Sequence, residues 1–319
     1  MLITFEETSK MIEDGKLLHI AGTEALISKL PSGNWIGGST EYFIAKESGK
    51  VSDDLLFVME FPYENFQISN YSTDNIDTIA DDVHEDGFSI LILPFDSAIH
   101  QDYANNAAKR YGVFLKHIVG WISGTNIDKP EQTPIVVNGL TGEVHKDKAV
   151  ALHFEIPDKM INVNIINIFE EEDNSPTLTF EETSFVVKEC LVNGERTVLA
   201  DYIAEHNIDI KLPLIGDYSG TKINISFRSS EDGVVNFYAP VSPNVKYKIA
   251  KKMDDYAETF NKRLANVADE ESIFSCNCVL NFVYGGLEGK VIDIFEGPIT
   301  FGEIAYLLVN QTLVYVTVQ

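Results

Sequence analysis

The sequence has few cysteines, few basic residues and no long apolar run, and each shortage excludes a class of protein. Three cysteines occur among 319 residues. They are too few for a disulfide framework, so we expect a reducing, cytoplasmic location. Lysine and arginine number 24 against 49 acidic residues, which gives a formal net charge of −25. Binding to nucleic acid or to an anionic membrane surface needs clustered basic residues, so this composition argues against both partners.

Apolar residues make up 45% of the chain, which is ordinary for globular proteins and supplies a sizeable core. No uninterrupted apolar stretch approaches the roughly 20 residues that a membrane-spanning helix needs. The segment from Met1 to Glu7 lacks the basic and apolar regions of a secretory signal. We therefore expect a cytoplasmic protein that does not contact membranes.

The apolar pattern predicts strands separated by a smaller number of helices. Phe88 to Leu93 has the length of a buried strand, and Ser272 to Val283 is also predicted as a strand. Apolar residues recur every three or four positions from Met253 to Val267, which predicts an amphipathic helix. Because turn signals separate many of the strands, we expect an α+β (mixed α/β) fold with largely antiparallel sheets flanked by helices. An αββα-like layering is one arrangement of that kind.

The length and a polar linker predict two similar-sized halves. The stretch from Glu170 to Pro176 is charged, contains no apolar residue before its proline and is typical of a linker. We place the two domains at residues 1–170 and 177–319.

Two short echoes occur within the chain. The segment Phe5 to Ser9 recurs as Phe180 to Ser184. Trp35-Ile36-Gly37-Gly38 is echoed by Trp121-Ile122-Ser123-Gly124. Duplication and chance both explain matches of this length.

Small and polar residues cluster at the ends of predicted strands in both halves. Glycine allows the backbone to approach a ligand or a neighbouring strand closely. A buried glutamate is costly unless it is paired, so Glu303 would either take a ligand ammonium or hydroxyl, or cap a backbone turn. Hydroxyl and amide side chains would orient the polar groups of a ligand. The candidate ligand-binding residues are Gly38, Ser39, Thr40, Cys276, Thr300, Gly302, Glu303 and Asn310.

The cysteines and one histidine leave other chemistry open. A structural zinc site needs four ligands, and Cys190 is the only cysteine besides Cys276 and Cys278, so the sequence favours buried strand cysteines. Cys276 near a strand start is nevertheless compatible with a catalytic nucleophile. His100 follows a buried strand, where functional loops often lie, and it equally fits an ordinary helix-surface histidine. We expect no metal and no cofactor.

The strand-end motifs resemble those of the FIST (F-box and intracellular signal transduction) domain family. The matching segments are Trp35-Ile36-Gly37-Gly38-Ser39-Thr40, Leu212-Pro213-Leu214-Ile215-Gly216, Phe274-Ser275-Cys276, Gly297-x-x-Thr300-x-Gly302-Glu303-Ile304 and Asn310-Gln311-Thr312. FIST domains are bacterial sensory modules proposed to bind small ligands. The resemblance implies a stand-alone protein with a FIST N-domain-like half and a FIST C-domain-like half. Two departures are Glu41-Tyr42-Phe43-Ile44 in place of Ala-Gly-Glu-Ile, and Val309 in place of the usual histidine.

From the residues and the resemblance together, we expect a non-catalytic binding or sensory protein of signal-transduction type. Its ligand would be a small polar metabolite such as an amino acid, and a signalling protein is a compatible further partner. One alternative is a hydrolase or transferase that uses Cys276 as its nucleophile. Another is an interaction scaffold whose acidic surface meets a basic partner.

Overall fold

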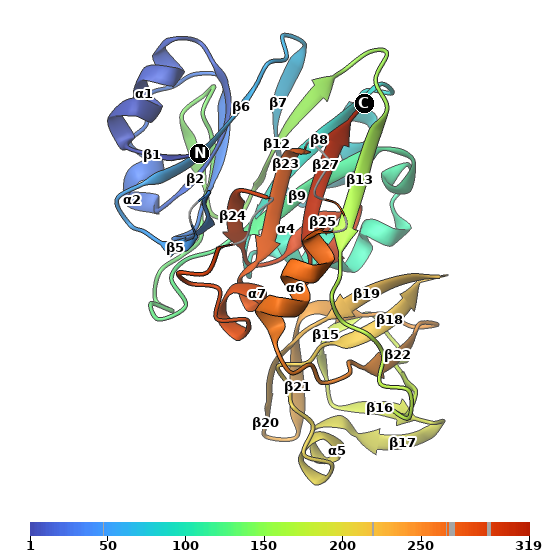
Figure 1. Ribbon diagram of the computed structural model, residues 1–319. Coiled ribbons are helices and arrows are strands. Elements are labelled where there is room, and N and C mark those ends of the chain that lie inside the picture. The colour runs from blue at the N-terminus through green and yellow to red at the C-terminus, as the bar shows by residue number, and fades with distance from the viewer. Residues whose placement is uncertain (47, 219, 266, 268–271, 292–294) are drawn as a thin grey trace.

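The computed structural model describes residues 1–46, 48–218, 220–265, 267, 272–291 and 295–319. Figure 1 shows a β-rich body that contains both chain termini, and a smaller β-rich module that projects from it. The module is inserted between β13 (Ile161–Ile166) and α6 (Tyr256–Ala265). The prediction of an α+β fold with largely antiparallel sheets is confirmed.

Within the described residues, the body consists of three consecutive repeats of one strand order. Each repeat contains an edge strand, a first parallel strand, a helix, a second parallel strand, a hairpin and a return strand. The first repeat comprises β1 (Leu2–Ile3), α1 (Phe5–Glu13), β2 (Leu17–Gly22), α2 (Glu24–Ile27), β3 (Trp35–Ser39), β4 (Tyr42–Ile44), β5 (Gly49–Val51) and β6 (Leu56–Phe61).

The other two repeats follow the same plan. The second comprises β7 (Phe66–Tyr71), η1 (Ile76–Thr78), α3 (Ile79–Asp82), β8 (Gly87–Pro94), α4 (Ala98–Asn106), η2 (Ala107–Lys109), η3 (Val113–Leu115), β9 (His117–Ser123), β10 (Val136–Asn138), β11 (Glu143–His145) and β12 (Ala149–Glu155). The third comprises β13, α6, β23 (Ser272–Cys278), α7 (Val279–Tyr284), β24 (Gly297–Thr300), β25 (Glu303–Ala305), β26 (Leu307–Val309) and β27 (Leu313–Val318).

Each repeat contributes its hairpin to the sheet of another repeat. Over the described strands, the three six-stranded sheets have the orders β1-β6-β2-β3-β10-β11, β7-β12-β8-β9-β25-β26 and β13-β27-β23-β24-β4-β5. The first sheet therefore receives the hairpin of the second repeat, the second sheet that of the third, and the third sheet that of the first. This cyclic exchange makes the three repeats one body.

Among the described strands, each repeat contains one parallel pair, formed by its first and second parallel strands, and an isolated parallel bridge joins Gly49 to Glu288. These pairs are β2 with β3, β8 with β9, and β23 with β24. A helix lies between the two strands of each pair, as a parallel connection requires. The strand β8 is buried at every position, which confirms the prediction for Phe88 to Leu93.

The inserted module contains two antiparallel sheets and one described helix. Its strands are ordered β17-β16-β14-β22-β18-β19 in the larger sheet and β15-β21-β20 in the smaller one, as far as they are described. The elements are β14 (Leu178–Thr179), β15 (Ser184–Val187), β16 (Glu189–Val192), β17 (Glu195–Val198), α5 (Leu199–Glu205), β18 (Leu214–Tyr218), β19 (Thr221–Ile225), β20 (Phe227–Glu231), β21 (Val234–Val241) and β22 (Lys246–Ile249).

The body and the module share one apolar core. The largest cluster of buried apolar residues includes Trp121 of the second repeat, Phe274 of the third and Phe237 of the module. Each large side chain buried in this way contributes about 2–3 kcal/mol. The contiguous core therefore fixes the module against the body.

Strand pairing does not follow the predicted division at residues 170 and 177. The edge strand β13 lies before that boundary and pairs with β27 near the C-terminus. The pairs of β24 with β4 and of β25 with β9 also cross it. The division into two FIST-like domains stays a prediction, whereas the sheets divide the chain into three repeats and one insertion.

One local prediction is wrong and one is confirmed. The strand predicted for Ser272 to Val283 ends at Cys278, where α7 begins, because a short apolar run fits either element and Gly285 caps a helix. The segment at Phe5 forms α1, whereas its echo at Phe180 is irregular and reaches the start of β15 at Ser184. The tryptophan echo lies in the equivalent strands β3 and β9. The predicted amphipathic helix is α6, which buries Phe260 and Leu264.

Candidate functional site

The second parallel strands of the three repeats end in small hydroxyl residues at matching register. Ser39 pairs with Gly22, Ser123 with Pro94, and Thr300 with Cys278. In open α/β sheets, ligands bind outside the carboxyl ends of parallel strands. The three strand ends are therefore the expected location of a ligand site.

Hydrogen bonds join the three strand ends into a ring. Gly124 N donates to Ser39 O at 2.8 Å, and Phe301 N donates to Ile122 O at 2.9 Å. Thr40 Oγ1 donates to Ile299 O at 2.7 Å. Each contact connects one repeat to the next, so the strand ends of all three repeats lie together.

The glycines of this region let the repeats approach one another. A Cβ atom on Gly38 would lie 2.8 Å from side-chain atoms of both Ile92 and Trp121. A Cβ on Gly124 would lie 1.8 Å from the ring of Phe301. Of the two explanations offered for Gly38, approach by a neighbouring strand fits, because protein atoms occupy the space next to it.

Ser39 and Thr40 line a cavity of about 370 Å³, which we call the polar cavity. Its walls come from the end of β3, the start of α2 and the long loop between β9 and β10. The lining residues are Thr23, Glu24, Ala25, Ser39, Thr40, Glu41, Asp53, Gly124, Thr125, Lys129 and Gln132. Cavities of roughly 300–1,000 Å³ hold small-molecule ligands, so this one suits a small metabolite.

Glu41 is the buried acid among the three carboxylate residues that line the polar cavity, the other two being the exposed Glu24 and Asp53. Its side chain is only 7% exposed, and Oε2 accepts a hydrogen bond of 2.7 Å from Asn126 Nδ2. Lys129 Nζ lies 3.4 Å from Oε1, and the lysine side chain is 42% exposed. A buried carboxylate thus faces a flexible cation across the cavity wall. Thr23 Oγ1 is also buried there and has no hydrogen-bond partner within the described chain.

The hydroxyls of Ser39 and Thr40 differ in which hydrogen-bonding roles remain unused. Thr40 Oγ1 donates to Ile299 O and accepts from Tyr42 N, so both its roles are filled. Ser39 Oγ accepts a 2.9 Å bond from Ile135 N. Among the described residues it donates none, so its hydrogen can reach a ligand.

Glu303 lies apart from the polar cavity in a sealed polar cluster. It has no exposed surface. Its Oε1 accepts from Thr300 Oγ1 at 3.0 Å, and its Oε2 accepts from Thr312 Oγ1 at 2.8 Å. Burial raises the pKa of Glu303 to about 8, although the hydrogen bonds from both threonines oppose this. The protonated form is therefore well populated near neutral pH.

The remaining predicted site residues are also buried near this cluster. Cys276 Sγ donates to Gly120 O at 3.4 Å, and burial raises the pKa of the Cys276 thiol well above its ordinary value. That direction is opposite to what a thiolate nucleophile requires. Gly302 has a φ of 145°. Asn310 is fully buried, and neither of its amide atoms has a partner in the described part of the chain.

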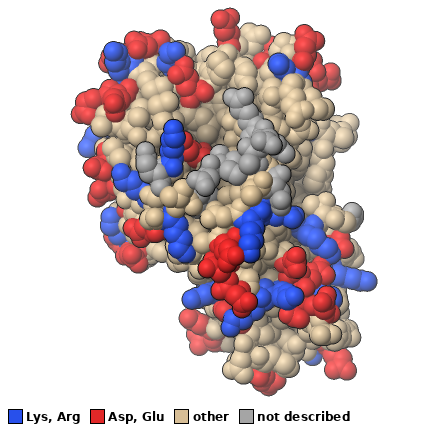
Figure 2. All heavy atoms as spheres, in the orientation of Figure 1, with Lys and Arg blue, Asp and Glu red and all other residues tan. Residues whose placement is uncertain are grey.

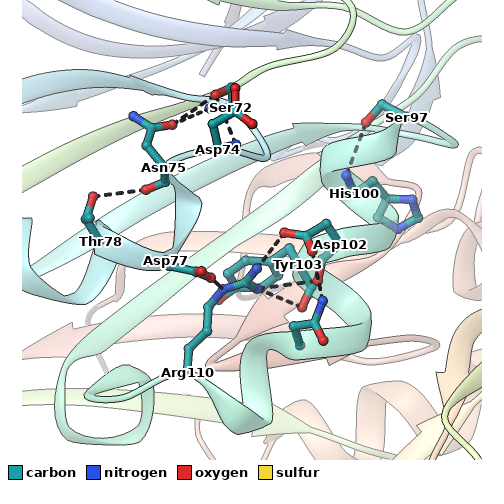
Figure 3. A network of polar contacts seen from close by, with 11 residues as sticks. Ser72, Asp74, Asn75, Asp77, Thr78, Ser97, His100, Asp102, Tyr103 and Arg110 are labelled. Carbon is teal, nitrogen blue, oxygen red and sulfur yellow. Dashed lines mark hydrogen bonds and ion pairs between the residues drawn. The ribbon is translucent and has the colours of Figure 1, made fainter.

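His100 lies in the first turn of α4, directly after the loop that follows β8. Its backbone N donates to Ser97 Oγ, which caps the helix (Figure 3). Its ring is 1% exposed, so the reading as a helix-surface histidine is wrong. Burial lowers the pKa of His100 to about 4, so the imidazole is neutral.

Sequence reasoning missed the residues that carry the charge of the polar cavity. Glu41 directly follows the predicted Ser39 and Thr40, and it is the acid that departs from the FIST pattern. Lys129 and Asn126 lie in a polar loop with no motif of its own. The one local signal for Glu41 is a charged residue just after a predicted strand. No local pattern marks the loop that carries Asn126 and Lys129.

Two classes of site are not found in the described residues. No group of three or more histidine, cysteine, aspartate or glutamate side chains could hold a metal ion there. None of the helices in the same residues is both long and apolar enough to cross a membrane.

Comparison with known proteins gives a family and nothing closer. Searches of curated proteins and of solved structures found no match. A family model with the description "Family of unknown function (DUF6976)" matches residues 3–319, which is nearly the whole chain. The chain therefore belongs to this family of unknown function (DUF6976).

Proposed function

We propose that this protein binds a small polar metabolite, an amino acid, in the polar cavity and acts as a non-catalytic sensory protein. The observation that carries the proposal is a buried carboxylate beside a lysine at a cavity of metabolite size, whose lining also includes the exposed acids Glu24 and Asp53. The Glu41 carboxylate and the Lys129 ammonium lie 3.4 Å apart at its wall. An amino acid carries the complementary pair of charges.

Each charge has a defined role in this proposal. The ligand ammonium binds the Glu41 carboxylate, which Asn126 already holds in place by a 2.7 Å hydrogen bond. The ligand carboxylate binds Lys129, whose exposed side chain can move aside from Glu41. Hydrogen bonds between charged groups are the strong ones in such a site, and Ser39 Oγ supplies a further donor.

The sensory part of the proposal is supported by the resemblance to FIST domains. The motif residues Ser39 and Thr40 lie at the cavity wall. The raised pKa of Cys276 favours binding over thiol catalysis. A signalling protein that reads the bound state is the partner that this proposal requires.

A thermal-shift screen with the common amino acids tests the proposal. A ligand at about 100 times its dissociation constant adds roughly 2.7 kcal/mol of stability, which raises the melting temperature. We expect at least one amino acid to stabilise the wild-type protein, and Glu41→Gln to remove the effect. Glu60→Gln is the matched control, because Glu60 forms a 2.8 Å pair with Lys16 elsewhere in the first repeat. A flat screen, or an equal loss in both variants, would contradict the proposal.

A further inference from the structure

A second cavity lies where the inserted module meets the body, and we call it the aromatic cavity. Its volume is about 440 Å³. Its walls come from the β8–α4 turn, the β9–β10 loop, the strands β20 and β21 of the module, and the turn after β24. It shares only Thr125 and Gln132 with the polar cavity, so the two are separate places on either side of one loop.

Three aromatic rings form one side of this cavity. The ring centroids of Phe95 and Phe301 are 5.4 Å apart, and those of Phe95 and Tyr238 are 6.1 Å apart. All three rings are half-buried. Tilted or offset rings at these distances accept another planar ring in the same arrangement.

The charges at the aromatic cavity differ in sign from those of the chain as a whole. Arg228 Nη2 lies 2.8 Å from Asp96 Oδ2, and Arg228 Nη1 donates to Asp96 Oδ1 at 3.0 Å. Lys146 also lines the wall, its side chain is 55% exposed, and its Nζ lies 3.7 Å from Glu24 Oε1. The lining thus holds two cations and one carboxylate in a protein with a net charge of −25, and Glu24, the partner of Lys146, lies outside this lining. Figure 2 shows basic side chains interspersed with acidic ones where body and module meet.

The guanidinium of Arg228 also faces the aromatic rings. Its Cζ lies 5.2 Å from the ring centroid of Phe95 and 6.0 Å from that of Tyr238. The arginine side chain is 43% exposed, so it can still reach a ligand. A planar ring and an anionic group would therefore find their partners side by side.

The helix α4 holds the body side of this cavity in place. Asp96 and Ser97 line the cavity directly before the first turn of α4. At the other end, Arg110 Nη2 pairs with Asp102 at 2.5 Å, and Arg110 also contacts Asp77 (Figure 3). The ring of His100 lies 5.6 Å from that of Phe95, and neither ring nitrogen has a partner within the described residues. An unused hydrogen-bonding group thus lies directly behind the aromatic wall.

We propose that the aromatic cavity binds an aromatic carboxylate. The ligand ring packs against Phe95, Tyr238 and Phe301, and its carboxylate pairs with Arg228 and Lys146. Because Arg228 and Tyr238 belong to the module while Phe95 and Phe301 belong to the body, the bound molecule contacts both parts. This inference concerns a different cavity and a different ligand class from the proposed amino-acid site.

Isothermal titration with benzoate, salicylate and quinoline-2-carboxylate tests the inference. We expect at least one of them to bind, and benzamide and cyclohexanecarboxylate to bind at least about tenfold more weakly than the best of them. Arg228→Gln should weaken binding at least about tenfold, and Tyr238→Leu should also weaken it. Arg196→Gln is the matched control, because Arg196 is an exposed module arginine paired with Glu181 and Glu189 elsewhere. It should bind like the wild type.

Three outcomes would overturn this inference. The first is the absence of binding by all three carboxylates at millimolar concentration. The second is equal binding of benzamide, which would remove the role of the charge. The third is an equal loss in Arg228→Gln and Arg196→Gln, which would show a general effect of lost positive charge.

Discussion

Glu41 of the first repeat and Glu303 of the third lie in the same part of the fold, and their surroundings differ. Each follows the second parallel strand of its repeat and precedes or begins the exchanged hairpin. Glu41 faces a cavity and a lysine, whereas Glu303 has two threonine hydroxyls and no exposed surface. The comparison teaches that a motif can mark a position without saying whether a ligand can reach it.

The largest expected effect concerns pH and Glu303. Its pKa is about 8 in the folded protein and near 4.5 when exposed. The folded state therefore binds the proton more tightly, and the stability from Glu303 is complete below pH 4.5 and is lost as the pH rises toward 8. Glu303→Gln removes this titration. Relative to that variant, the wild-type protein should lose stability on the order of 4 kcal/mol between pH 5 and pH 9.

Urea unfolding of both proteins across this pH range measures the difference directly. Other titrating groups occur in both proteins and cancel in the comparison. Glu41→Gln is the control for losing a carboxyl group beside the polar cavity. A wild-type minus Glu303→Gln difference that stays flat with pH would contradict the sealed environment of Glu303.

The next effect in size is the cost of truncating each carboxyl side chain. Glu303→Ala leaves a buried void and removes the acceptors of Thr300 and Thr312, so it should cost about 3 kcal/mol at pH 5. Glu41→Ala opens onto the polar cavity, so we expect a loss of about 1 kcal/mol. Thermal unfolding is measured at pH 5 because Glu303 is protonated in the folded wild-type protein at that pH. The comparison then contains no free-energy cost of a buried charge. Equal losses would mean that Glu41 is as enclosed as Glu303.

The smallest expected effect is on thiol labelling near Glu303. Cys276 is 1% exposed, and its pKa is raised by burial and by the nearby carboxyl group of Glu303. Under native conditions it should react with a thiol reagent on the order of a hundredfold more slowly than an exposed cysteine. Peptide-level mass spectrometry can follow it beside buried Cys190. Labelling of Cys276 well ahead of Cys190 would favour the alternative of a cysteine-dependent enzyme.

The sequence predicts the fold class well because its signals are local. The continuous apolar run in β8 and the helical spacing in α6 each depend on neighbouring residues. The cyclic exchange of hairpins joins strands such as β4 and β24, which are far apart in the chain. No local pattern records that pairing, so the three-repeat body could not be predicted.

The candidate site was predictable in part for the same reason. Ser39 and Thr40 were expected at a strand end, and the cavity does lie there. Lys129 reaches Glu41 from a loop 88 positions away, so its role depends on the fold. From its place in the Gly297–Ile304 segment, Glu303 was expected either to hold a ligand or to cap a backbone turn, and Glu41 was not among the candidates. The enclosing threonine Thr312 makes the difference, and it meets Glu303 only once the β25–β26 hairpin between them has formed.

The most direct test of the central claim is isothermal titration of the best-bound amino acid into three proteins: the wild type, Glu41→Gln and Glu303→Gln. If Glu41 is the residue that receives the ligand ammonium, its variant should bind at least about tenfold more weakly, a loss of roughly 1.4 kcal/mol. The Glu303→Gln variant should bind as the wild type does, because its carboxyl group is sealed. The opposite pattern, with binding lost in Glu303→Gln and kept in Glu41→Gln, would contradict the account.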